Sequence, residues 1–200
     1  MDALAAQCVK EKPTGIRHRR RSSVAQQGIQ VLFPEQANAV TAVWRSISAG
    51  EDWPEDAIVG MLDAPQTAYS DDVANQWCQV DVGEFRRMLP NRYALRHGHD
   101  DGSYRLRNWR LEGRNEQSDE WTTLRAHGDD DSIPDRGHGV GCWPVEGQAG
   151  LGFRYLRILS TGLNSRYATR GTHQVAYNNN YLMCCGLEFW GTLIDTSRYG

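Results

Sequence analysis

The stretch from Tyr93 to His127 constrains the fold most, because its residue pattern is that of β-strands separated by tight turns. From Arg105 to Gly113 the side chains alternate with a period of two, which places Trp109 and Leu111 on one side. Arginines on that side can lay their aliphatic stems over the apolar stripe and keep their charged ends in water. A second alternating run, Trp121 to Ala126, follows a polar turn with the composition of a β-hairpin. The stretch is therefore predicted to form three strands.

Other segments continue the all-β pattern. Phe153–Ser160 alternates, and we expect Leu156 and Ile158 to face the core. Tyr181–Ile194 is predicted to close the sheet, whereas Glu35–Ile47 fits a short helix or a strand almost equally well. Short strands, Gly/Asp turns and the lack of a long helical pattern indicate an antiparallel β-sandwich of the jelly-roll type. Such a sandwich leaves its long loops at one end.

The chain is predicted to have one domain and two extensions. Residues 1–28 are expected to form a basic flexible tail, and residues 195–200 a loose C-terminus. Residues 29–194 are assigned to the sandwich, with 29–62 as lead-in elements and 63–194 as its core. The basic run at 17–21 is either a nuclear address, the context of a phosphorylation site at Ser22 or Ser23, an anion-binding tail or a solvated lead-in.

Charge and cysteine content exclude several function classes. The net charge of −3 gives no electrostatic case for nucleic acid, and no apolar run approaches the roughly 20 residues of a membrane span. Five cysteines, an odd number that includes the vicinal pair Cys184–Cys185, form a poor disulfide framework. We expect buried reduced thiols. Reduced thiols, together with the lack of a signal-peptide pattern at the amino terminus, favour a cytoplasmic location, or a nuclear one through the basic tail.

Motifs for catalysis are missing from the sequence. It contains no Gly-x-Ser-x-Gly elbow, phosphate loop, His-Glu-x-x-His helix or dinucleotide fingerprint. Carboxylates gather in loops, where they are ordinary turn formers. The prediction is a protein without enzymatic activity.

Several segments carry a family resemblance in their order and spacing. They are WCQVDVG (77–83), YALRHG (93–98), RNWRLEGRNE (107–116, followed by Trp121), TLRAH (123–127), FRYLRILSTGLNS (153–165) and GLEFWGTL (186–193). They resemble the F5/8 type C, or discoidin-like, branch of the galactose-binding-like jelly rolls. The subtype they resemble most is the intracellular one attached to BTB-domain proteins and HECT-type ubiquitin ligases. This resemblance implies a discoidin-like β-sandwich and a substrate-recruiting or scaffold setting.

Function on such a scaffold normally lies in its loops. We expect the loops Gly98–Ser103, Gly128–Gly141 and Gly162–Asn180 to hold a protein or peptide partner. The candidate ligand-binding residues are Arg96, His97, His99, Asp100, Asp129, Arg136, Asn164 and Tyr167.

Two alternatives remain open at this point. One is a carbohydrate-binding module, assisted by calcium as in some sugar-binding relatives, where Glu188 would take the place of a last-strand ligand. The early loop lacks the Asp-Gly that the resemblance requires ahead of Trp77, so we predict no cofactor and favour a salt bridge from Glu188 to a strand arginine. The other alternative is a structural subunit of a large ciliary or cytoskeletal assembly.

Overall fold

The computed structural model describes residues 26–29, 41–44, 69–146, 150, 152–164, 167–170, 173–176 and 180–197. Regular structure in these residues is β-strand throughout, and none of their segments is a helix that could cross a membrane. The strands are β1 (Gln26–Ile29), β2 (Thr41–Trp44), β3 (Trp77–Asp81), β4 (Arg86–His97), β5 (Trp109–Arg114), β6 (Thr122–His127), β7 (Val140–Pro144), β8 (Tyr155–Ser160), β9 (Tyr167–Arg170), β10 (His173–Ala176) and β11 (Cys184–Asp195).

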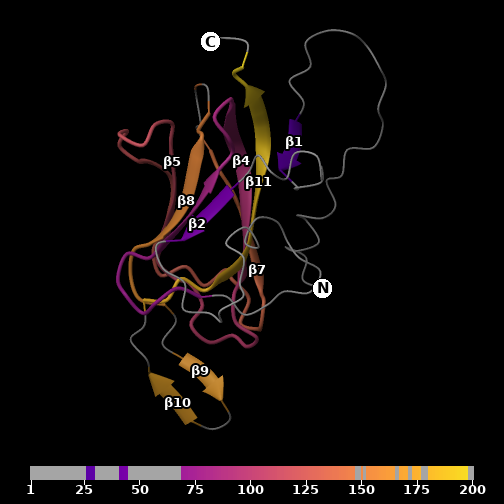
Figure 1. Ribbon diagram of the computed structural model, residues 1–200. Coiled ribbons are helices and arrows are strands. Elements are labelled where there is room, and N and C mark those ends of the chain that lie inside the picture. Colours follow the sequence, from indigo (N-terminus) through magenta and orange to yellow (C-terminus); the bar gives the residue numbers. More distant parts are fainter. Residues whose placement is uncertain are drawn as a thin grey trace, which may run out of the picture.

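Two antiparallel sheets pack face to face, as Figure 1 shows. One has the strand order β1-β11-β4-β7 and the other β2-β3-β8-β5-β6. β2 pairs with β3 and β5 pairs with β6 in the second sheet, whereas the connections β3–β4, β4–β5, β6–β7 and β7–β8 each lead from one sheet to the other. The chain therefore crosses repeatedly between the layers. The predicted all-β sandwich is confirmed.

Both sheets send alternating side chains into one core. Trp109 and Leu111 of β5 and Leu156 and Ile158 of β8 are completely buried, as their alternation predicted. Tyr93 of β4 reaches the same core from the opposite sheet. Each such side chain contributes roughly 1.5–3 kcal/mol through removal of apolar surface from water.

The structure departs from the predicted strand that begins at Arg105, because β5 begins at Trp109. The preceding arginines bind a neighbouring loop and do not extend the strand. Arg105 Nη1 donates a hydrogen bond to the Ile133 carbonyl oxygen at 3.2 Å, and Arg107 Nη2 donates to the Asp129 carboxylate at 2.8 Å. At these positions the arginine side chains therefore bind the loop, and the backbone does not extend β5.

Strands also occur in segments that were predicted as loop, tail or helix. β9 and β10 form a hairpin within the stretch expected to be a polar loop. β1 begins at Gln26 and pairs with β11, and β2 is a strand where a helix was the alternative. The tail at 1–25 and the remainder of 30–62 lie outside the described residues.

Cys78, Cys184 and Cys185 are free and buried, as expected. Burial raises the pKa of the Cys185 thiol to about 12 and that of the Cys184 thiol as well, so both are protonated at neutral pH. Cys142 in β7 differs from the expectation, because it is disulfide-bonded.

Candidate functional site

The loops of the sandwich divide between its two ends, because neighbouring strands run in opposite directions. β4, β6 and β8 finish at the same end at which β3, β5, β7 and β11 begin. This end, at the bottom of Figure 1, is called the loop end below. Its described segments are 69–76, 98–108, 128–139, 161–164 and 180–183.

Hydrogen bonds join the segments of the loop end to one another. The His138 amide donates to the His99 carbonyl oxygen at 2.9 Å, which ties 128–139 to 98–108. Asn108 Nδ2 donates to the Leu163 carbonyl oxygen at 2.8 Å, which adds 161–164. The Leu182 amide donates to Ser70 Oγ at 2.8 Å, so the first and last segments are joined as well. The loops thus form one connected surface.

Backbone strain gathers at the same end. Among the described residues, the non-glycine residues with positive φ are Asn75, Tyr104, Asp129 and His138, and all four lie in loop-end segments. Asn, Asp and His tolerate this conformation, whereas for a bulky residue such as Tyr104 it costs on the order of 1–2 kcal/mol. Strained residues of this kind cluster at binding and active sites.

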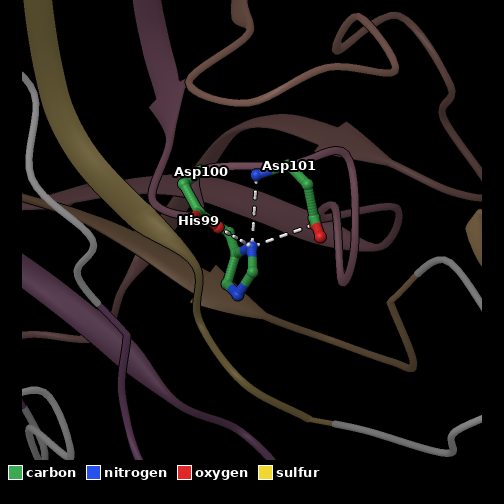
Figure 2. A group of neighbouring side chains, drawn as sticks. All are labelled: His99, Asp100 and Asp101. Atoms are coloured by element: carbon green, nitrogen blue, oxygen red, sulfur yellow. Dashed lines mark hydrogen bonds and ion pairs between the residues drawn. The ribbon is translucent and has the colours of Figure 1, made fainter. Parts of the chain in front are cut away.

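His99, Asp100 and Asp101 form a compact group just beyond β4 (Figure 2). Nδ1 of His99 lies 3.0 Å from Asp100 Oδ1 and 2.9 Å from Asp101 Oδ1. The Asp101 amide also donates to this nitrogen at 3.3 Å, so Nδ1 is the atom at which the ring and both aspartates meet. The other ring nitrogen points away from both aspartates in Figure 2. The structure therefore brings together the predicted residues His99 and Asp100.

This group is the one cluster of three metal-ligating side chains among the described residues. It does not fit calcium, since calcium takes six to eight oxygen ligands and this group offers two carboxylates already engaged by an imidazole. Glu188 is not part of it: this residue lies within β11 and pairs with Ala94, five residues before His99. Glu188 therefore adds no ligand to the His99 group.

His97 is completely buried, although it was predicted as a ligand-binding residue. Its Nε2 donates to the Asp101 carbonyl oxygen at 3.1 Å, while Nδ1 is buried without a hydrogen-bond partner. Burial, followed by the nearby His99, lowers the His97 pKa to about 4. The ring is therefore neutral at physiological pH, and its hydrogen bond to Asp101 fixes the 98–103 loop.

The remaining predicted residues occupy different environments. Asn164 is 3% exposed, and its side chain donates to the Tyr181 carbonyl oxygen. Arg96 lies in the middle sheet position of β4, between Gly186 and Val140, and is partly buried. Tyr167 begins β9. Asp129 and Arg136 are exposed on the 128–139 loop.

Two tyrosines at the loop end, Tyr69 and Tyr181, were not predicted as site residues from the sequence, and they form a group with Tyr104. The rings of Tyr69 and Tyr181 meet edge to face at 5.7 Å, and those of Tyr104 and Tyr181 at 5.9 Å. Tyr104 also contacts the His99 ring edge to face at 5.9 Å. All are partly exposed.

A chain of polar side chains crosses the core next to this end. Trp109 Nε1 donates to Tyr93 Oη at 2.9 Å, and Tyr93 Oη lies 2.6 Å from His127 Nε2. His127 Nδ1 binds the Asp130 carboxylate, and its ring stacks on Trp109 at 3.9 Å. Tyr93 is 0% and His127 6% exposed, so a substrate cannot reach the Tyr93–His127–Asp130 series, although its residue types are those of a nucleophile, a base and an acid. Its role is to hold both sheets and the 128–139 loop together.

Burial also sets the protonation states in this chain. It raises the pKa of Tyr93 and lowers the pKa of His127, despite the hydrogen bond that His127 makes with Asp130. Burial alone would raise the Asp130 pKa, but hydrogen bonds from Ser132 and His127 outweigh it and lower that pKa. Asp130 is therefore ionised and His127 neutral at neutral pH.

A hollow of about 300 Å³ lies at the opposite end of the sandwich. It is lined by Gly83, Glu84, Phe85, Arg86, Asp195 and Ser197. Phe85 is 56% exposed there and supplies a comparison point for experiments on the loop end.

Two curated proteins are similar to this chain in sequence. The E3 ubiquitin-protein ligase Ufd4 of Drosophila melanogaster is 32% identical over 131 residues, which are 64% of this chain and 4% of the relative. A BTB/POZ domain-containing protein of Arabidopsis thaliana is 31% identical over 109 residues, 54% of this chain and 13% of the relative. The chain thus spans a small part of the length of both relatives. No family model matches the sequence.

Solved structures with the same fold include lectin and carbohydrate-binding domains. A fucolectin from striped bass (Morone saxatilis) serum has a TM-score of 0.55 and 14% identity, covering 80% of this chain and 48% of that one. A CBM32 domain from a family 31 glycoside hydrolase of Clostridium perfringens has a TM-score of 0.52 and 14% identity, with 78% and 94% coverage. An F5/8 type C domain from Bacteroides fragilis has the same TM-score and identity, with 78% and 93% coverage.

The fold is therefore that of the discoidin-like, galactose-binding-like β-sandwiches. Within this class it shares the fold of an F5/8 type C domain, and its sequence relatives are a ubiquitin ligase and a BTB/POZ protein, the protein types indicated by the resemblance of its motifs. The resemblance drawn from the sequence is confirmed.

Proposed function

We propose that this chain is a non-catalytic binding module whose loop end holds a protein or peptide partner. The observation that carries the proposal is the construction of that end: separate loops are hydrogen-bonded into one surface, and the described positive-φ side chains gather in it. A surface held rigid before binding loses little conformational entropy when a partner docks. Tyr93 and His127, which lie buried next to this surface, stabilise the framework and have no access to substrate.

The setting we propose is substrate recruitment or scaffolding in a ubiquitin-ligase context in the cytoplasm. It is supported by the sequence similarity to Ufd4 and to a BTB/POZ protein. One fold hosts many functions, so the fold alone does not define the partner.

Affinity capture from cytosolic extract tests the proposal. The bait is the full chain, compared with a loop-end variant carrying His99→Ala, Asp129→Ala and Arg136→Ala and with an opposite-end variant carrying Phe85→Ala. Partners identified by mass spectrometry should be lost with the loop-end variant and kept with the other. Equal recovery by all three baits would show that the loop end is not the binding surface.

Carbohydrate binding is the second candidate. Partly exposed tyrosines at the loop end and the lectin and carbohydrate-binding names of structures with this fold favour it. A glycan array with the wild-type chain, a Tyr181→Ala variant and added chelator tests this. Hits that vanish in the variant support sugar binding, whereas an array without hits rejects it.

A further inference from the structure

We infer that the tyrosine cluster of the loop end, defined as Tyr69, Tyr104 and Tyr181, binds a lysine or arginine side chain of a basic peptide segment in the partner. This inference rests on the proposed function and specifies the chemistry of its ligand. Three features of the loop end support this ligand: the arrangement of the rings, the carboxylates near them and the charge of the whole end.

The rings of the cluster pack edge to face and do not form a flat platform. Tyr181 meets Tyr69 at an interplanar angle of 86° and Tyr104 at 70°, with centroids 5.7 and 5.9 Å apart. Rings packed edge to face offer π-faces in different orientations, and a π-face attracts a cation. A sugar ring instead calls for one broad, exposed aromatic face with polar groups around it.

Carboxylates lie within electrostatic reach of these rings. The Tyr181 pKa is raised, first by burial and then by the negative charge of Asp72, with smaller contributions from Tyr104, Tyr69 and Asp71. Asp72 is held in place because its Oδ1 accepts hydrogen bonds from Asn180 N at 2.7 Å and Asn180 Nδ2 at 3.3 Å. Asp72 is exposed, so its carboxylate can also meet a ligand. Tyr104 and Asp71 have further contacts within the chain, and the inference rests mainly on Tyr69, Tyr181 and Asp72.

The whole loop end is more acidic than the rest of the molecule. Its described segments contain eight aspartates and three arginines, a formal balance of −5, compared with −3 for the entire chain. Two of those arginines are already engaged: Arg107 lies 2.8 Å from Asp129, and Arg105 lies 3.6 Å from Asp135. The surface is therefore complementary to a cationic segment.

The backbone of Tyr104 supports a ligand role for the cluster. Its φ of 61° is costly for a tyrosine, and the preceding turn holds it there because the Ser103 amide donates to Asp101 Oδ1 at 2.7 Å. The same turn carries the His99 group, so the ring position and the acidic rim are set by one loop segment.

Fluorescence anisotropy with a labelled synthetic peptide tests the inference. The probe carries three lysines separated by Gly-Ser, and its matched control carries acetyl-lysine at the same positions. The full chain should bind the lysine probe and not the acetylated one, with affinity that falls as salt rises. Tyr181→Ala should weaken binding about fivefold to tenfold, while Tyr181→Phe, which keeps the ring, should retain it.

Isosteric and distant variants separate binding from folding. Asp72→Asn should weaken the lysine probe at least threefold with unchanged thermal unfolding, whereas Phe85→Ala and Glu120→Gln at the opposite end should not. Equal binding of both probes, no binding of either, or equal losses in the distant variants would each overturn the inference.

The chain contains its own basic run at 17–21, which is the competing occupant. A full-length variant with Arg17, Arg19, Arg20 and Arg21 replaced by Gln should bind the probe as the wild type does. If it binds tenfold more tightly, the run of the chain itself fills the cluster and the assignment to a partner is wrong. Partner capture lost in the loop-end variant without lysine-probe binding would reject this inference and leave the proposed function standing.

Discussion

His97 is expected to make the stability of this domain strongly pH-dependent between pH 7 and pH 5. The ring is completely buried, Nε2 donates to the Asp101 carbonyl oxygen, and Nδ1 has no partner. A proton added at Nδ1 would create a buried charge with no acceptor, and burial accordingly lowers the pKa to about 4.

The direction of this pH dependence follows from the difference in proton uptake between the folded and the unfolded chain. The unfolded chain takes up a proton at its histidine near pH 6.5, whereas the folded chain does so near pH 4, so acidification between these values favours unfolding. At about 1.4 kcal/mol per pKa unit, the full loss is roughly 3 kcal/mol, and about 2 kcal/mol of it occurs between pH 7 and pH 5. His127 adds to the loss in the same direction, because burial lowers its pKa too.

Urea unfolding at pH 7.0, 6.0, 5.5 and 5.0 measures this dependence. In His97→Gln, whose amide can donate to the same carbonyl oxygen, the loss between pH 7 and pH 5 should be about 2 kcal/mol smaller than in the wild type. Ile133→Val, a buried control expected to cost about 1 kcal/mol, should keep the wild-type pH dependence. Parallel pH curves for His97→Gln and the wild type would refute the assignment of a buried neutral His97.

Further predictions concern packing and thiol reactivity. Glu112→Ala should lower the unfolding free energy by about 3 kcal/mol in urea titrations, because it leaves Arg157 without its carboxylate partner; Arg157 Nε and Nη2 lie 2.8 and 2.7 Å from Glu112 Oε2. A change below about 1 kcal/mol would mean that the pair is effectively solvated. Gly113→Ala should cost about 1–3 kcal/mol in thermal unfolding, since its Cβ would lie 2.6 Å from the Phe153 ring; an unchanged midpoint would show that the ring moves freely. Cys185 should resist iodoacetamide at pH 8 in peptide mapping until the chain is unfolded, because burial holds its pKa at about 12; rapid native labelling would contradict its burial.

The core was readable from the sequence because burial in a strand follows a period of two. Trp109 and Leu111 alternate with arginine and glutamate, and Leu156 and Ile158 alternate in the same way. The same rule would also have placed His97 correctly. It lies in phase with Tyr93 and Leu95 on β4, and all three face the core. Its position next to a Gly/Asp loop suggested exposure, but the strand continues through it.

The loop end was only partly readable, since its contacts join residues far apart in the sequence. Tyr69 and Tyr181 are separated by 112 positions and meet because β3 and β11 begin at the same end of the sandwich. Asn164 was predicted as a ligand-binding residue because its side chain is polar. That side chain instead donates a hydrogen bond to the Tyr181 carbonyl oxygen. Such pairings depend on strand order, which local sequence patterns do not encode.

The buried polar chain explains how a loop rich in Gly and Asp can serve as a binding surface. Residues 128–139 cannot form a core of their own, but Asp130 reaches into the sandwich and binds His127, while Ser132 accepts a hydrogen bond from Trp143 at 2.9 Å. The neighbouring Asp129 is thereby fixed in its positive-φ conformation, where it pairs with Arg107. Polar groups that would be costly in the core are satisfied by the loop, and the loop gains the rigidity that recognition requires. The same side chains therefore stabilise the fold and shape the surface proposed to bind.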